Sequence, residues 1–145
     1  MNLDVRFNTM HGAKGKEADY VVLVGMVRRG MPSTIEDDPL LQLAMPAGDT
    51  FTDAEERRLF YVALTRTKRS VLLLTVEGQE SPFLLELILD GHLTLESGAG
   101  EEIPVVICRK CGVGRTVRKN GRYGEFYSCS TYPDCDGKLH TRARR

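Results

Sequence analysis

Residues 20–25 read Tyr20-Val21-Val22-Leu23-Val24-Gly25, a run that is apolar almost throughout and rich in β-branched side chains. Such a run is typical of a strand that helices cover on both faces, as in a parallel α/β sheet. Residues 71–76 form a second run of this kind, and residues 3–10 alternate apolar and polar side chains like a short strand. We therefore expect an α/β unit built on a parallel sheet.

Helical periodicity appears on either side of the second apolar run. Thr52 and Glu55 are spaced as a capping box, which predicts a helix from Thr52 to about Lys68. Ser81-Pro82 has the composition of a helix start, and Gly91 is expected to end that helix. Three strands are few for a sheet of the ~5–6 strands typical of proteins. The unit is therefore expected to be the end of a larger domain.

The composition of the 145-residue chain, 41% hydrophobic and 28% charged, is that of a globular protein. No apolar run approaches the ~20 residues that a membrane helix needs, so no membrane partner is expected. The first residues lack the basic-then-apolar order of a signal peptide, which predicts a cytoplasmic location.

The charge of the chain is split, although its formal total is zero. Residues 1–104 hold 10 Lys and Arg against 17 Asp and Glu, a net charge of −7, whereas residues 105–145 hold 10 against 3, a net charge of +7. An acidic body with a basic tail indicates two units, the second of which meets a polyanion. Residues 96–102 have linker composition, so we expect one domain at 1–95 and another at 103–145.

Two segments of the first unit hold residues suited to binding phosphate. In the loop at residues 9–20, Gly12 and Gly15 allow a backbone to approach a phosphate closely, although such glycines also occur in ordinary turns. The helix at residues 55–68 starts acidic and ends basic, as the helix dipole favours, so its arginines also fit a solvated face. The patterns are Thr9-x-His11-x-Ala13-Lys14-Gly15-x-Glu17 and Glu55-Glu56-Arg57-Arg58-Leu59-x-Tyr61-Val62-Ala63-Leu64-Thr65-Arg66.

Together these two patterns resemble motifs V and VI of the UvrD/Rep-like superfamily 1 DNA helicases, and residues 18–25 resemble the helicase IV branch of that family. The resemblance covers residues 4–90 and implies the C-terminal part of the second RecA-like helicase domain. It implies that Thr9 and His11 contact single-stranded DNA, that Gly15 and Glu17 face bound ATP, and that Arg66 is the catalytic arginine that reaches the γ-phosphate.

The resemblance also implies what lies outside this chain. No Gly-x-x-x-x-Gly-Lys-Ser/Thr phosphate loop is present in the 145 residues. In the family that loop and the Mg²⁺-binding acidic motif belong to the first RecA-like domain. The expected partners are therefore the missing N-terminal helicase domains, with ATP and Mg²⁺ bound only in the complete enzyme.

The second unit contains all four cysteines of the chain. Cys108 and Cys111 form a Cys-x-x-Cys pair, and Cys129 and Cys135 form a wider pair that contains Pro133. Two such pairs close a tetrahedron around Zn²⁺, and a cytosolic setting favours metal over disulfides. Two disulfides in a secreted mini-domain are the alternative.

The cysteine pattern also resembles the four-cysteine zinc ribbon of bacterial type IA topoisomerases, a small β domain that binds single-stranded DNA. The resemblance covers residues 105–140 and fits the interleaved aromatic and basic side chains, because bases stack on aromatic rings while cations neutralise phosphates. Phe126 and Tyr132 also fit a role in the ribbon core. The candidate DNA-binding residues are Arg115, Arg118, Lys119, Arg122, Tyr123, Phe126, Tyr127 and Tyr132.

Taken together, the two resemblances imply the C-terminal portion of an ATP-dependent DNA helicase of the bacterial cytosol or nucleoid, translocating 3′ to 5′. Such a portion supplies half of the ATP site and is expected to be inactive alone. The alternative is a non-catalytic, zinc-containing module for nucleic-acid binding or protein interaction.

Overall fold

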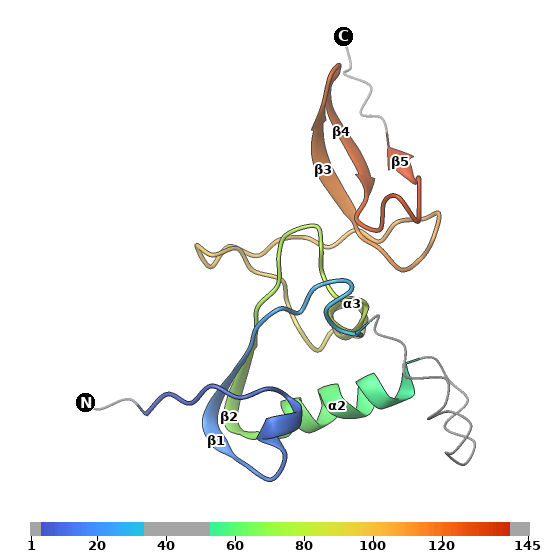
Figure 1. The fold of residues 1–145 in the computed structure, drawn as a ribbon. Helices are drawn as coiled ribbons and strands as arrows, with labels where there is room; N and C mark the ends of the chain where they lie inside the picture. Colours follow the sequence, from blue (N-terminus) through green and yellow to red (C-terminus); the bar gives the residue numbers. More distant parts are fainter. Residues whose placement is uncertain (1–3, 34–52, 140–145) are drawn as a thin grey trace, which may run out of the picture.

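The structure is a computed structural model that describes residues 4–33 and 53–139. It places an α/β unit at one end of the molecule and a small β ribbon at the other, as predicted (Figure 1). No helix among the described residues is long and apolar enough to cross a membrane.

The sheet of the α/β unit contains two parallel strands, β1 (Ala18–Leu23) and β2 (Thr67–Leu73). Helix α2 (Ala54–Leu64) lies between them in the sequence, so the described part of this unit is a β-α-β crossover. The predicted parallel sheet is confirmed, although both strands begin and end earlier than the apolar runs that indicated them.

Aromatic and aliphatic side chains form one core between the sheet, α2 and helix α3 (Pro82–Leu89). The rings of Phe60 and Phe83 stack with centroids 5.8 Å apart and join the two helices. The core consists of Leu23, Met26, Met31, Phe60, Ala63, Phe83 and Leu84.

The predicted cover on both faces of the sheet is wrong. Alternate side chains of β1 and β2 point away from the core, so Val22 and Leu72 are 55% and 56% exposed. The strand predicted at residues 3–10 is also absent from the described residues, since residues 4–9 have no regular structure and Phe7 is 94% exposed. An alternating stretch becomes a strand only where a neighbour satisfies its backbone groups.

The two helices begin differently. Ser81 caps α3 as predicted, because its hydroxyl accepts the N–H of Phe83 at 3.2 Å. Thr52, the expected N-cap of α2, lies outside the described residues, and the N-cap of α2 is Asp53. Asp53 has a left-handed backbone (φ 58°) and makes no side-chain cap bond. The carboxylate of Glu56 instead accepts the N–H of Ser33 at 3.1 Å, so it ties α2 to the turn after β1.

The ribbon is a three-stranded antiparallel sheet of β3 (Thr116–Gly121), β4 (Gly124–Cys129) and β5 (Lys138–Leu139). Just before β3, Ile107 and Arg115 form an isolated antiparallel bridge. Before the ribbon, Glu96 and Glu102 pair across a turn, so the predicted linker is folded back on itself. The domain boundary placed there remains a prediction.

Candidate metal centre and nucleic-acid interface

The four cysteine sulfurs converge between the loops that flank β3 and β4. All four are free thiols within 4.8 Å of one another. The Sγ atoms of Cys108 and Cys135 are 3.9 Å apart, and those of Cys111 and Cys129 are 3.5 Å apart. Disulfide sulfurs lie about 2.05 Å apart, whereas four sulfurs around Zn²⁺ at about 2.3 Å form edges of about 3.8 Å. The cluster therefore fits zinc, and the disulfide alternative does not hold here.

Two glycines let the chain approach the sulfurs closely. A Cβ added to Gly114 would lie 2.6 Å from the Sγ of Cys129, and one added to Gly137 would lie 2.7 Å from the Sγ of Cys108. Both contacts are far inside van der Waals distance, so any larger residue would push a ligand away. Gly137 also donates its N–H to the Sγ of Cys135 at 3.4 Å.

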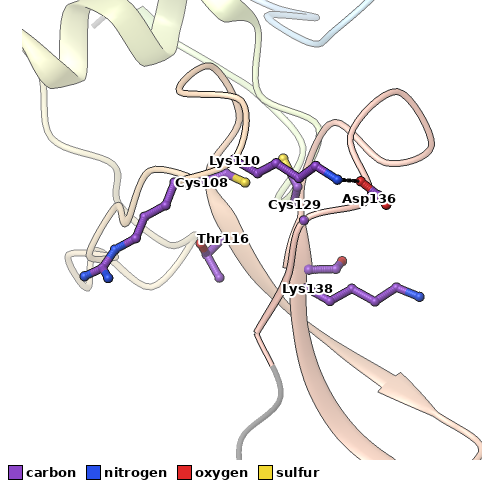
Figure 2. A pocket seen from close by; sticks show the side chains of 9 residues that line it. Cys108, Lys110, Thr116, Cys129, Asp136 and Lys138 are labelled. Atoms are coloured by element: carbon purple, nitrogen blue, oxygen red, sulfur yellow. Dashed lines mark hydrogen bonds and ion pairs between the residues drawn. The ribbon is translucent and has the colours of Figure 1, made fainter.

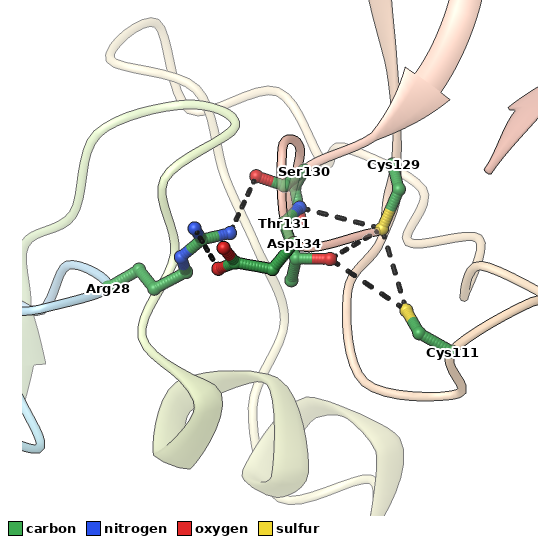
Figure 3. Close-up of polar contacts among 6 residues, drawn as sticks. All are labelled: Arg28, Cys111, Cys129, Ser130, Thr131 and Asp134. Carbon is green, nitrogen blue, oxygen red and sulfur yellow. Dashed lines mark hydrogen bonds and ion pairs between the residues drawn. The ribbon is translucent and has the colours of Figure 1, made fainter. Parts of the chain in front are cut away.

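The surroundings of Cys111 and Cys129 shift the pKa values of these two thiols in opposite directions. Burial raises the pKa of Cys111, but the N–H groups of Gly114 and Val113 outweigh it and lower that pKa to about 6. Burial raises the pKa of Cys129 to about 12, although the Thr131 hydroxyl, 3.0 Å from its sulfur, opposes this (Figure 3). Metal must therefore displace protons to bind, which makes its affinity depend on pH.

A cavity of about 380 Å³ adjoins the cysteine cluster beside Cys108 and Cys129 (Figure 2). Lys110 at its rim is paired with Asp136, whereas Arg109 and Lys138 have no ion-pair partner within residues 4–33 and 53–139. The buried hydroxyl of Ser128 also lines the cavity and lacks a hydrogen-bond partner in that part of the chain. These groups suit an anionic ligand such as a phosphate.

The tip of the β3–β4 hairpin presents an aromatic ring to solvent. Tyr123 is 96% exposed, and the guanidinium of Arg122 lies 5.9 Å from its ring centroid. Lys119 lies similarly over the ring of Tyr132, which is 52% exposed. A second cavity of about 330 Å³ lies at this tip. Exposed rings flanked by cations are the arrangement that stacks unpaired bases.

The remaining candidate DNA-binding residues are less exposed, with one exception. Phe126 and Tyr127 are half-buried, and Arg118 is exposed but paired with Glu125 at 3.1 Å. Arg115 differs most from expectation, because it is 3% exposed and its guanidinium lies 2.7 Å from the carboxylate of Glu80. A buried, paired arginine is not available to a phosphate, so Arg115 leaves the candidate DNA surface.

The first helicase-like pattern forms an exposed turn before β1. His11 lies in the short 3₁₀ helix η1 (His11–Ala13), and the hydroxyl of Thr9 accepts the N–H of Gly12 at 3.0 Å. Gly15 has φ +78°, a backbone conformation that favours glycine. Glu17 is exposed and lies 3.1 Å from Lys68.

Backbone pairing brings the ends of the two helicase-like patterns together. The N–H of Ala18, which follows Glu17, donates to the carbonyl of Arg66 at 3.1 Å where β1 and β2 begin. The side chain of Arg66 folds back on α2, where its Nε donates to the carbonyl of Val62 at 2.9 Å.

Three important residues gave no signal in the sequence. Arg28 and Asp134 form an ion pair of 2.6 Å across 106 residues, and Glu80 is fully buried beside Arg115. Each looks like an ordinary surface charge in its own segment, and only the fold makes them partners. Glu56 and Arg57 of the second helicase-like pattern hold α2 in place through contacts with Ser33 and Glu86.

Comparisons with known proteins agree with this architecture. A family model for the UvrD-like helicase C-terminal domain matches residues 2–78, and one for the topoisomerase DNA binding C4 zinc finger matches residues 105–142. DNA helicase IV of Escherichia coli is 40% identical over 84 residues, which are 57% of this chain and 12% of that protein.

Other relatives match different shares of the chain. A probable DNA helicase of Mycoplasma pneumoniae is 34% identical over 97 residues, 63% of this chain and 17% of that protein. DNA topoisomerase 1 of Helicobacter pylori is 61% identical over 28 residues, 19% of this chain and 4% of that protein. The chain thus spans only a small part of the length of these relatives. It belongs to the UvrD-like helicase C-terminal domain family and carries a topoisomerase-type C4 zinc ribbon.

Proposed function

We propose that this chain is the C-terminal portion of an ATP-dependent DNA helicase that translocates 3′ to 5′ on single-stranded DNA. The observation that carries the proposal is the backbone bond between Ala18, next to Glu17, and Arg66 at the start of two parallel strands. Family membership supports it, because Glu17 and Arg66 belong to the two patterns that resemble helicase motifs V and VI. Gly15, Glu17 and Arg66 then supply half of an ATP site.

The other half of that site belongs to the N-terminal helicase domains, which provide the phosphate loop and bind Mg²⁺. Arg66 stabilises the charge that builds on the γ-phosphate as it is transferred. To do so, its guanidinium exchanges its bonds to Val62 and Thr65 for the phosphate. Thr9 and His11 contact the DNA backbone from the neighbouring turn.

The ribbon provides the second grip on the strand. One Zn²⁺ held by the four cysteines shapes its loops, and its chemistry here is structural rather than catalytic. Tyr123 and Tyr132 stack unpaired bases, while neighbouring cations neutralise phosphates. Exposure of both rings next to Arg122 and Lys119 supports this role.

The test of the ATP site is Arg66→Ala in a protein that contains all helicase domains. Arginines that reach a γ-phosphate contribute ~10³–10⁵ in rate in related reactions, so DNA-stimulated ATP hydrolysis should fall by that order while DNA binding persists. Arg69→Ala is the matched control, because Arg69 is exposed and its one ion-pair partner in the described part of the chain is Asp19, at 3.8 Å.

Two outcomes would contradict the proposal. ATP hydrolysis that survives Arg66→Ala would show that Arg66 does not reach the γ-phosphate and that this chain supplies no catalytic half of the ATP site. ATP hydrolysis by residues 1–145 alone would show that the site needs no second half.

A further inference from the structure

The loops that hold the metal ligands also contact the α/β unit. Arg28, just beyond β1, donates to the Oδ2 of Asp134 at 2.6 Å and to the backbone carbonyl of Ser130 at 3.4 Å (Figure 3). Both acceptors lie in the loop from Cys129 to Cys135. Arg28 is mostly buried by this contact, with 19% of its side chain exposed.

A second contact follows the other metal-binding loop. Arg115 lies directly after the loop from Cys108 to Gly114, and its guanidinium is 2.7 Å from Glu80. The two side chains are 4% and 0% exposed, so this ion pair is buried at the junction. The N–H of Gly78 donates to the same Glu80 carboxylate at 2.8 Å. Removing one partner of such a pair leaves an unpaired buried charge, which proteins tolerate poorly.

The two metal-binding loops are tied to each other at this surface. The N–H of Ser130 donates to the carbonyl of Arg115 at 2.8 Å, and the Ser130 hydroxyl accepts the N–H of Arg115 at 3.1 Å. The loops therefore reach the α/β unit as one surface, and the four sulfurs that they carry lie within 4.8 Å of one another.

Two ion pairs of opposite polarity across the junction fix the orientation of the ribbon relative to the α/β unit. The ribbon offers Arg115 and Asp134. The α/β unit offers Arg28 to Asp134 and Glu80 to Arg115, with Glu77 3.8 Å from the same guanidinium. Reversed pairs of this kind allow one relative orientation and place like charges together in others. The surface is thus built for the α/β unit of the same chain.

We propose that zinc docks the ribbon onto the helicase-like unit. By holding the loops after Cys108 and Cys129 together, the metal assembles the surface that binds Arg28 and Glu80. Arg115 is a positioning residue for this junction rather than a contact to nucleic acid. By thermodynamic reciprocity, docking then strengthens zinc binding. This inference holds whether or not the chain belongs to an ATP-driven enzyme.

The experiment compares residues 1–145 with Arg28→Ala/Glu80→Gln, both loaded with Zn²⁺ in reducing buffer. Small-angle scattering reports docking, and competition with a chelator reports zinc affinity. The double variant should still bind one zinc but show a larger radius of gyration. Its zinc affinity should fall by roughly 5–150-fold, the usual range for coupled equilibria.

Several controls keep the result interpretable. Asp4→Asn/Arg6→Ala removes an exposed ion pair of the α/β unit and should change neither the radius of gyration nor the zinc affinity. Circular dichroism checks that helices α2 and α3 remain folded. Arg28→Ala alone should enlarge the radius of gyration and lower the zinc affinity, each by less than the double variant does. An unchanged radius in the double variant would overturn docking by these pairs. An enlarged radius with unchanged zinc affinity would overturn the coupling to the metal.

Discussion

At the residue scale, two aromatic residues of one hairpin, Tyr123 and Phe126, differ in how far they are buried. The ring of Tyr123 is almost fully exposed at the turn between β3 and β4, where it stabilises no core. Residue 121 of the same hairpin is a glycine, and a Cβ at this position would lie 2.9 Å from the ring of Phe126. The hairpin therefore places Phe126 inward, as half-buried packing, and leaves Tyr123 free for a ligand.

Replacing Tyr123 with alanine should weaken binding of single-stranded DNA without destabilising the chain. Stacking on one aromatic side chain contributes ~1–3 kcal/mol per base, so the dissociation constant should rise about 5- to 150-fold. Fluorescence anisotropy with a labelled oligonucleotide measures this change. Tyr61→Ala is the matched control, since Tyr61 is also exposed, at 67%, but lies on α2 in the acidic unit. Equal losses in the two variants would show that the hairpin ring does not stack.

At the element scale, one ion pair, Arg57 with Glu86, connects α2 to α3. Arg57 makes two bonds to the carboxylate of Glu86, at 2.6 and 2.8 Å, and its guanidinium lies 4.6 Å from the Phe83 ring centroid. The hydrogen bonds from Arg57 hold the pKa of Glu86 below its ordinary value. The pair is about half exposed, so its contribution is modest.

Glu86→Gln should therefore lower stability at pH 7 by about 0.2–1 kcal/mol. A carboxylate whose pKa is lowered in the folded state stabilises fully above its unfolded pKa of about 4.3, and loses this as pH falls further. The difference between Glu86→Gln and the parent should thus shrink below about pH 4. Thermal unfolding followed by the helical signal measures it, with Glu55→Gln as a control within one helix. A gap that persists in acid would assign the effect to packing.

The same scale shows how far the sequence predicts this molecule. The apolar runs predicted β1 and β2 because a buried strand needs such side chains, but periodicity cannot tell that only one face is covered. The cysteine spacing predicted the metal cluster because ligand pairs are local. Arg115 was misassigned because its charge matches that of Arg118 and Lys119, and only its distant partner Glu80 distinguishes it.

At the scale of the whole molecule, the charge split predicts how DNA binding responds to salt. The ribbon region has a net charge of +7, and four thiolates with Zn²⁺ reduce it to about +5. The acidic region repels the same polyanion. Binding should therefore weaken steeply as salt rises, because each neutralised phosphate of a single strand contributes about 0.7 to the logarithmic slope.

Titrations at several salt concentrations measure this slope. Arg122→Gln should reduce it by about 0.7, because it removes one cation from the ribbon. Arg6→Gln serves as the control, because Arg6 is exposed in the acidic region and pairs with Asp4. Equal reductions in both variants would contradict the expectation that the ribbon dominates DNA binding.

The uncovered face of the β1–β2 sheet has a different consequence for these 145 residues in solution. Val22 and Leu72 lie side by side in the strand register, and water must order around both. Within the described residues, each strand also has one unpaired edge, whose backbone groups are templates for a strand of another molecule. Aliphatic surface next to open edges promotes self-association that grows with protein concentration. The exposed face of the β1–β2 sheet therefore governs how readily this chain self-associates. Its folded monomer is best measured in dilute samples.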